Sequence, residues 1–315
     1  MKKTLLLIAT LLASYVGMAQ ETYHPTAENL KAREQFQDEK FGIFLHWGLY
    51  SMMGTTEWIM TNRDINYKEY PKLAKTFYPS EFDADAWVKA IKAAGAKYIT
   101  ITTRHHDGFS LFKTATNTYN SVDGTPFKRD IIKEMADACQ RNGIKLHLYY
   151  SHLDWGREDY PVGRTGTGTG RPKEKANWAS YYKFMNTQLT ELLTNYGKVG
   201  AIWFDGWWDH DSDAKPFDWQ LEEQYALIHK LQPQCLVANN HHHTPFPGED
   251  IQIFERDLPG ENKAGLSGQS IGRLPLESCQ TINEHWGYNI TDTLYKSPKE
   301  LIQMLVRAAG KNANL

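Results

Sequence analysis

The sequence has few cysteines and no excess of basic residues. Three cysteines among 315 residues are too few, and odd in number, for a disulfide framework, so we expect buried thiols that pack as small apolar side chains. The formal net charge of −2 argues against a nucleic-acid partner, because nucleic-acid-binding surfaces are clustered and basic. The spacings H-E-x-x-H and C-x-x-C are missing, and adjacent histidines at 105–106 and 241–243 point apart on an extended chain. We therefore expect no metal and no other cofactor.

Long apolar runs are missing after the N-terminus. The run at residues 4–13 follows Lys2 and Lys3 and precedes the small residues Gly17 and Ala19. This order is typical of a secretory signal peptide, and the run is too short for a spanning helix. We predict a signal peptide over residues 1–19 and a catalytic domain over residues 20–315. The mature protein is expected to be exported, periplasmic or extracellular, with no membrane span.

Aromatic residues, by contrast, are abundant: the chain has 10 Trp, 17 Tyr and 13 Phe. Large aromatic side chains fill protein cores, and their flat faces also stack on the apolar faces of sugars. Composition alone leaves both interpretations open.

Short apolar segments alternate with helical segments from about residue 35 onward. Six buried strands are expected at residues 42–46, 98–103, 144–150, 201–205, 235–238 and 251–255. Helices are expected at residues 83–94, 130–141, 176–196, 219–231 and from 297 onward. Weaker strand patterns near 278–282 and 312–315 bring the number to eight. The pattern predicts an α/β fold, a (β/α)8 barrel, over a doubly wound sheet, because no glycine-rich phosphate loop follows the first strand.

Polar residues follow the carboxyl ends of the expected strands, where barrel enzymes carry their active sites. They include His46, His105, His106, Ser151, Asp205, Asn239, Asn240, His241, His242, His243 and Glu255. Side chains alternate along a strand, so Asp205 shares the inward face with Trp203. Burying an aspartate between aromatic residues is unfavourable unless the carboxylate is paired or used. Glycoside hydrolysis requires two flanking carboxylates, and Asp205 is the candidate nucleophile.

Three glutamates are candidates for the second carboxylate, the general acid/base. Glu255 ends the sixth strand with the inward parity and is preferred. Glu261 lies in a Pro-Gly loop that could swing toward the site. Glu277 precedes the expected seventh strand, which would place it at the wrong end of the barrel or in a long loop.

Taken together, the motifs resemble glycoside hydrolase family 29, the retaining α-L-fucosidases. In chain order they are Phe-Leu-His-Trp-Gly at 44–48, Glu-Trp at 57–58, Thr-Arg-His-His-Asp-Gly-Phe at 103–109, Tyr-Tyr-Ser at 149–151, Trp-Phe-Asp-Gly at 203–206 and Trp-Gly-Tyr at 286–288. The resemblance runs from about residue 30 to the end. It implies an exo-acting enzyme that removes terminal α-L-fucosyl residues from fucosylated oligosaccharides or glycoconjugates by double displacement.

The resemblance also implies individual site residues. It assigns the nucleophile to Asp205 and the substrate pocket to His46, Glu57, Trp58, His105, His106, Tyr149, Trp203 and Trp286. Glu255 is aligned by position only, because the chain reads Phe-Glu-Arg-Asp at 254–257 where Thr-Pro-Glu is commoner. A second departure is His241 and His242, where many members carry an arginine after the fifth-strand Asn.

Members of the family usually continue past residues 312–315 into the rest of a strand and a β-sandwich domain. The resemblance therefore implies a barrel truncated in its last strand, without the β-sandwich, and we expect exposed strand edges there. Linkage preference and oligomeric state stay open. Another retaining barrel glycosidase, such as a galactosidase, and a non-catalytic glycan-binding protein are the alternatives.

Overall fold

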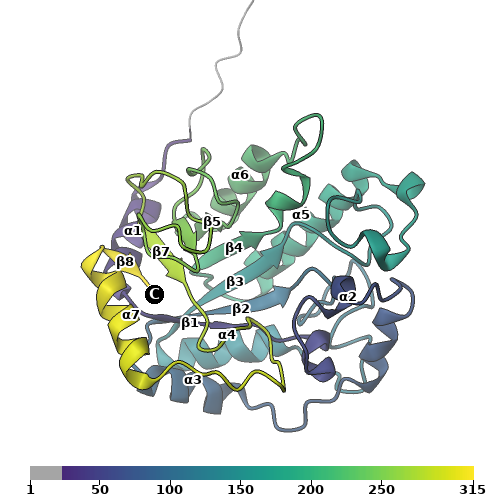
Figure 1. Cartoon of the computed structure of the whole chain (residues 1–315), viewed down its shortest axis with the longest axis horizontal. Coiled ribbons are helices and arrows are strands. Elements are labelled where there is room, and N and C mark those ends of the chain that lie inside the picture. Colours follow the sequence, from purple (N-terminus) through teal and green to yellow (C-terminus); the bar gives the residue numbers. More distant parts are fainter. Residues whose placement is uncertain (1–22) are drawn as a thin grey trace, which may run out of the picture.

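The computed structural model describes residues 23–315, so the predicted signal peptide lies outside the described residues. Eight strands form a barrel with helices around it (Figure 1). The strands are β1 (Gly42–Leu45), β2 (Tyr98–Arg104), β3 (Lys145–Ser151), β4 (Ala201–Asp205), β5 (Leu236–Asn239), β6 (Gln252–Glu255), β7 (Leu276–Cys279) and β8 (Ala313–Asn314). The (β/α)8 fold predicted from the sequence is thereby confirmed.

Backbone pairing closes the barrel at both seams between its two sheets. Strands β1 to β5 pair in parallel and in order, as do β6 to β8, and a parallel bridge between Ala238 and Ile251 joins the two sets. At the second seam the Gly42 amide donates to the Leu315 carbonyl, and the Leu315 amide donates to the Lys40 carbonyl, both at 2.9 Å. The expectation of exposed edges at this seam is therefore wrong, because Leu315 continues the short strand β8 and pairs with the start of β1.

Alternate residues of the strands pack on opposite sides of the barrel wall. Those facing the interior form one cluster, which includes Tyr149, Ala201, Trp203, Leu236, Ala238, Ile251 and Ile253. Those facing the helices form another, which includes Ile99, Ile101, Leu146, Leu148, Tyr150, Ile202, Phe204 and Val237. This period of two is why inward parity at a strand end predicts which polar side chains face the barrel mouth.

Five helices lie where the sequence predicted them: α3 (Ala84–Ala93), α4 (Ile131–Asn142), α5 (Trp178–Asn195), α6 (Leu221–Leu231) and α7 (Pro298–Gly310). The side chains of Asp83, Asp130 and Asn177 cap the first three by accepting a hydrogen bond from a backbone amide of the first turn. Helix α7 begins with a capping box between Ser297 and Glu300.

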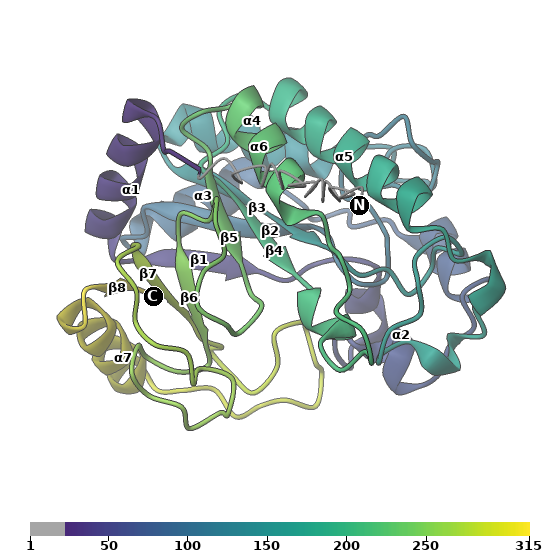
Figure 2. The same ribbon diagram turned by 90° about the horizontal axis from the view of Figure 1, so that it is seen from above.

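Two further helices, α1 (Ala27–Glu39) and α2 (Ile59–Asn62), were not predicted and lie at opposite ends of the strands (Figure 2). Phe36 of α1 packs on Tyr98 and His147, so α1 covers the amino ends of the strands. Short 3-10 helices are η1 (Leu49–Met53), η2 (Tyr70–Thr76), η3 (Thr167–Thr169), η4 (Lys173–Lys175) and η5 (Trp207–His210).

The cysteines are free and buried, as expected. In the part of the chain that the structure describes, no helix combines the length and hydropathy needed to cross a membrane.

Candidate active site

A cavity of about 210 Å³ lies at the carboxyl ends of the strands. All ten site residues predicted from the sequence line it: His46, Glu57, Trp58, His105, His106, Tyr149, Trp203, Asp205, Glu255 and Trp286. The other lining residues are Phe44, Arg164, Trp208, Asn240, His242, Leu266 and Cys279. The fold thus brings together residues that are separated by up to 242 positions in the sequence.

Asp205 ends β4 with its side chain 14 % exposed. Its Oδ1 accepts hydrogen bonds from the amide of Gly206 at 2.8 Å and the indole of Trp208 at 3.0 Å. Its Oδ2 accepts one from the Tyr149 hydroxyl at 3.0 Å. Gly206 permits this turn because its φ is 94°, a conformation that side chains with a Cβ rarely adopt. Burial and the neighbouring carboxylate of Glu255 raise the pKa of Asp205 to about 6.

Glu255 ends β6 and faces the same cavity. Its Oε2 accepts hydrogen bonds from the side-chain amide of Asn240 at 2.8 Å and lies 2.9 Å from Nε2 of His242. Burial alone would raise the pKa of Glu255, but these hydrogen bonds outweigh it and hold that pKa below its ordinary value.

The two carboxylates share one hydrogen-bond donor, the side-chain amide of Asn240. This amide nitrogen lies 3.4 Å from Oδ1 of Asp205 and 2.8 Å from Oε2 of Glu255. These two contacts limit the separation of the two oxygens to less than the ~6.5 Å at which inverting glycosidases begin, whereas retaining enzymes hold the carboxyls ~5–5.5 Å apart. This limit accommodates the spacing of a retaining pair.

Three histidines of the cavity are uncharged near neutral pH. Burial lowers the pKa of His46 to about 4 and holds the pKa values of His105 and His106 well below the ordinary range. The hydroxyl of Ser151 donates to the Leu153 carbonyl at 2.6 Å, so it accepts from Nδ1 of His106 at 2.7 Å. Nε2 of His106, 3.6 Å from Oδ2 of Asp205, is then an acceptor for a ligand hydroxyl.

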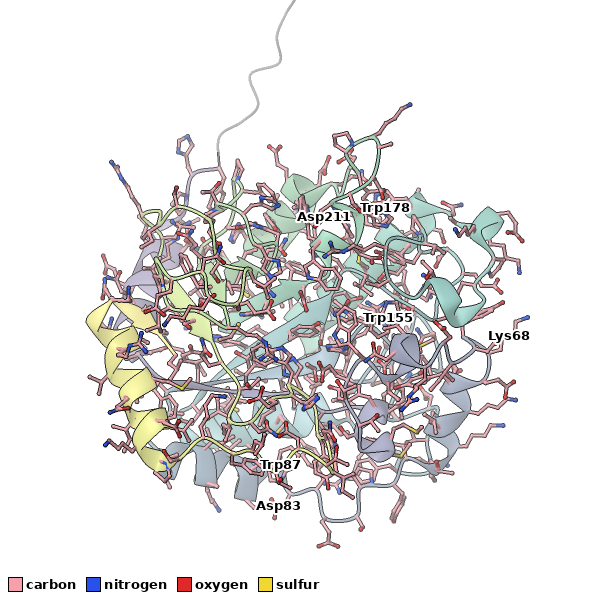
Figure 3. All side chains as sticks on the ribbon, viewed as in Figure 1. Lys68, Asp83, Trp87, Trp155, Trp178 and Asp211 are labelled. Carbon is pink, nitrogen blue, oxygen red and sulfur yellow. The ribbon has the colours of Figure 1, made fainter. Side chains whose placement is uncertain are left out.

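Aromatic side chains form the walls of the cavity. Trp286 stacks on His46 with ring centroids 5.5 Å apart. Trp58 stacks on Trp208 at 5.6 Å and meets Trp155, labelled in Figure 3, edge-on at 5.3 Å. Glu57 anchors the wall near Trp286, because its Oε2 accepts the amide of Gly287 at 2.7 Å.

Glu277 and Glu261, the alternative acid/base candidates, do not line the cavity. The prediction that Glu277 precedes the seventh strand is wrong, since β7 begins at Leu276 and buries Glu277 inside the barrel. There its carboxylate accepts hydrogen bonds from Trp203 at 2.8 Å and Tyr98 at 3.0 Å. Glu261 forms ion pairs with Lys263 and Arg307.

Sequence reasoning did not assign several residues of the cavity. Trp208 belongs to the aromatic run after Asp205, which could have indicated it. Asn240 and His242 follow the fifth strand, and their position at a polar strand end was the only sequence feature that indicated them. Arg164 lies in a glycine- and threonine-rich loop, and no sequence pattern indicated that it would line the cavity. Its side chain stands over Trp208, 5.2 Å from the ring centroid, and pairs at 3.2 Å with Asp211, which Figure 3 labels.

The three consecutive histidines have different polar partners and exposures. His241 contacts Glu249 at 3.0 Å, His242 contacts Glu255, and His243 is exposed. Across residues 23–315, no three His, Cys, Asp or Glu side chains are grouped as metal ligands.

Comparison with known proteins points to one family. The family model described as α-L-fucosidase matches residues 10–315. A putative α-L-fucosidase of Caenorhabditis elegans is 28 % identical over 96 % of this chain, and the human plasma α-L-fucosidase is 31 % identical over 93 %. The chain spans 64 % of the length of each of these two relatives.

Solved structures give the same result. The α-L-fucosidase isoenzyme 1 of Paenibacillus thiaminolyticus matches with a TM-score of 0.77 at 37 % identity, covering 90 % of this chain and 69 % of that one. The α-L-fucosidase AlfC of Lactobacillus casei, in complex with its α-L-fucose product, matches with a TM-score of 0.77 at 28 % identity. That match covers 90 % of this chain and 89 % of that one.

Proposed function

The chain belongs to the α-L-fucosidase family, and from this premise we propose that it is an exo-acting, retaining α-L-fucosidase. Its substrates are terminal α-L-fucosyl residues of oligosaccharides or glycoconjugates. The single observation that carries the proposal is the Asp205–Glu255 pair, held at one amide of Asn240 within a cavity lined by neutral histidines and tryptophans. The cavity volume of about 210 Å³ is below the ~300–1,000 Å³ of sites for larger ligands, which suits one terminal sugar.

In the first step Asp205 attacks C1 of the fucosyl unit while the glycosidic oxygen receives a proton from Glu255. The C1–oxygen bond breaks, the aglycone leaves as an alcohol, and an ester joins C1 to Asp205. In the second step Glu255 removes a proton from water, the water oxygen attacks C1, and Asp205 leaves as a carboxylate. The donors on Asp205, from Gly206, Trp208 and Tyr149, support both its ionised form and its departure.

Substrate binding is assigned to the remaining predicted residues. His46, His105 and His106 are buried and uncharged. They form hydrogen bonds with sugar hydroxyls, and binding therefore does not require a charged side chain to be buried. Glu57 adds a carboxylate acceptor. The rings of Trp58 and Trp286, which are partly exposed, offer flat apolar faces to the sugar ring and its methyl group. Tyr149 and Trp203 are buried and stack on each other at the base of the cavity.

The test is release of 4-nitrophenol from 4-nitrophenyl α-L-fucoside. We expect turnover by the wild type, its loss in Asp205→Gly, and partial recovery when azide replaces the missing carboxylate and yields a fucosyl azide. Asp213→Gly is the matched control, because Asp213 follows the same strand but contacts His210 and not the cavity. No turnover of the fucoside by the wild type, or turnover of a galactoside in its place, would refute the proposal.

We also propose export to the periplasm or the medium, on the order of Lys2, Lys3, the apolar run and the small residues before Gln20. N-terminal sequencing of the mature protein checks this, with Gln20 expected as the first residue. An intact N-terminus on cytoplasmic protein would contradict it.

A further inference from the structure

His242 follows the fifth strand and touches the proposed general acid/base. Its Nε2 lies 2.9 Å from Oε2 of Glu255, and its side chain is 20 % exposed in the cavity wall. The backbone of His242 has a φ of 66°, in the left-handed region that residues other than glycine rarely occupy.

Several charged or titratable groups surround the pair that His242 forms with Glu255. Charged or titratable neighbours of the His242–Glu255 pair are Asp205, His46, Arg256, Cys279, His241 and His243, and Arg164 lines the same cavity. His241 is engaged with Glu249, and His243 is exposed. Among the described residues, His242 is the one titratable side chain that hydrogen-bonds the carboxylate of Glu255.

Arginine and histidine differ in this setting. A guanidinium stays protonated and can only stabilise the ionised carboxylate, whereas an imidazolium can also pass its proton on. The other donor to Oε2, the amide of Asn240, holds the carboxylate in place but has no proton to give.

We propose that His242 is a positioning residue that stores the proton which Glu255 delivers to the leaving group. This inference rests on the proposed function. In the resting pair the proton is on His242 and Glu255 is ionised. As the C1–oxygen bond breaks, the proton moves from Nε2 to the Glu255 carboxyl and from there to the glycosidic oxygen, which leaves His242 neutral. In the second step Glu255 takes a proton from the attacking water and returns it to His242.

As the pH rises and the stored proton is lost, kcat/KM falls for substrates whose leaving group needs an acid. The same loss leaves substrates with an activated leaving group unaffected, because their departure needs no proton.

The experiment compares the wild type with His242→Arg and His242→Gln on two substrates. One is an alkyl α-L-fucoside, which needs a general acid, and the other is α-L-fucosyl fluoride, which does not. For His242→Arg we expect a loss of about 10²-fold or more in kcat/KM on the alkyl fucoside, and near wild-type turnover of the fluoride. For His242→Gln we expect the alkaline limb of the pH profile to move to lower pH, since Glu255 must then hold its own proton.

The fluoride reports folding of each variant, and His243→Arg is the matched control, with wild-type rates expected on both substrates. An alkyl-fucoside rate and pH profile unchanged in His242→Arg would overturn the inference. So would an equal loss on both substrates, because that would mean a structural role. A wild type inactive on both substrates would instead refute the proposed function.

Discussion

The indole nitrogen of Trp203 donates a hydrogen bond to the buried carboxylate of Glu277, 2.8 Å away inside the barrel. Trp203 lines the active-site cavity and Glu277 does not, so the carboxylate fixes the indole ring without contacting the ligand. Tyr98 donates to the same carboxylate at 3.0 Å. Burial disfavours the ionised form and raises the pKa of Glu277. The hydrogen bonds from Trp203 and Tyr98 act in the opposite direction and favour the carboxylate.

Replacing Glu277 tests this support. Glu277→Ala leaves two buried donors without an acceptor, and we expect it to lower the free energy of unfolding by about 1–3 kcal/mol. Glu277→Gln keeps an acceptor for one donor and should lose less. Thermal unfolding measures the loss of stability in both variants. Kinetics on 4-nitrophenyl α-L-fucoside should show a larger change in KM for Glu277→Ala than for Glu277→Gln. A wild-type melting temperature and KM in Glu277→Ala would contradict the support role.

The choice of Glu255 over Glu261 as the general acid/base gives a second prediction. Glu255→Gln removes the proton donor, so kcat/KM on an alkyl fucoside should fall by about 10²–10⁴-fold. On α-L-fucosyl fluoride kcat/KM should stay close to the wild-type value, because fluoride leaves without a proton, whereas kcat should fall, because the second step still needs Glu255 as a base. Glu261→Gln is the matched control, because Glu261 is paired with Lys263 and Arg307 outside the cavity. A loss confined to Glu261→Gln would transfer the role to that residue.

The acid limb of the activity follows from Asp205. Its pKa of about 6, raised by burial and by Glu255, means that the nucleophile becomes protonated as the pH falls below about 6. We expect kcat/KM to decrease there, approaching tenfold per pH unit. Tyr149→Phe removes a hydrogen bond that lowers this pKa, so the limb should move to higher pH while the stacked ring is kept. A limb that stays in place would show that another group controls it.

Side-chain alternation explains why part of the site was predictable from the sequence. Asp205 and Glu255 end regular strands, and the period of two alone assigns them to the barrel interior. Asn240 and His242 lie beyond the end of β5 in irregular backbone, where no periodicity reports direction, and the φ of 66° at His242 has no sequence signal. Their contacts with the two carboxylates therefore required coordinates.

The errors in the fold have related physical causes. Strand β7 contains the buried polar residues Glu277 and Ser278, which hide its apolar pattern, so the strand was expected too late. Helix α1 buries only Asn29 and Phe36, which leaves too narrow an apolar stripe to recognise. The closure at Leu315 depends on two backbone hydrogen bonds and on the buried side chain of Asn314, which accepts from the Lys40 amide at 3.0 Å and donates to the Phe36 carbonyl at 2.7 Å. These partners lie more than 270 positions apart, so no local sequence pattern reports the contacts.

The loop that carries Arg164 is held by Asp209, which gives the last prediction. The buried carboxylate of Asp209 accepts hydrogen bonds from the amide of Thr165 at 2.8 Å, the hydroxyl of Thr165 at 2.6 Å and the hydroxyl of Tyr160 at 2.9 Å. This anchor fixes Arg164 in the cavity wall.

Asp209→Ala should release this loop. It removes three acceptor contacts, so we expect unfolding to become easier by about 1–3 kcal/mol and KM for a fucosylated disaccharide to rise. The KM for α-L-fucosyl fluoride, which has no second sugar, should change less, because we expect Arg164, exposed in the cavity wall, to act on the aglycone. Asp211→Ala removes only the ion pair of Arg164 and serves as the matched control for the anchor, with stability expected to change by less than about 1 kcal/mol. Equal KM changes on both substrates in Asp209→Ala would mean that the loop supports the fucose pocket and not the aglycone side.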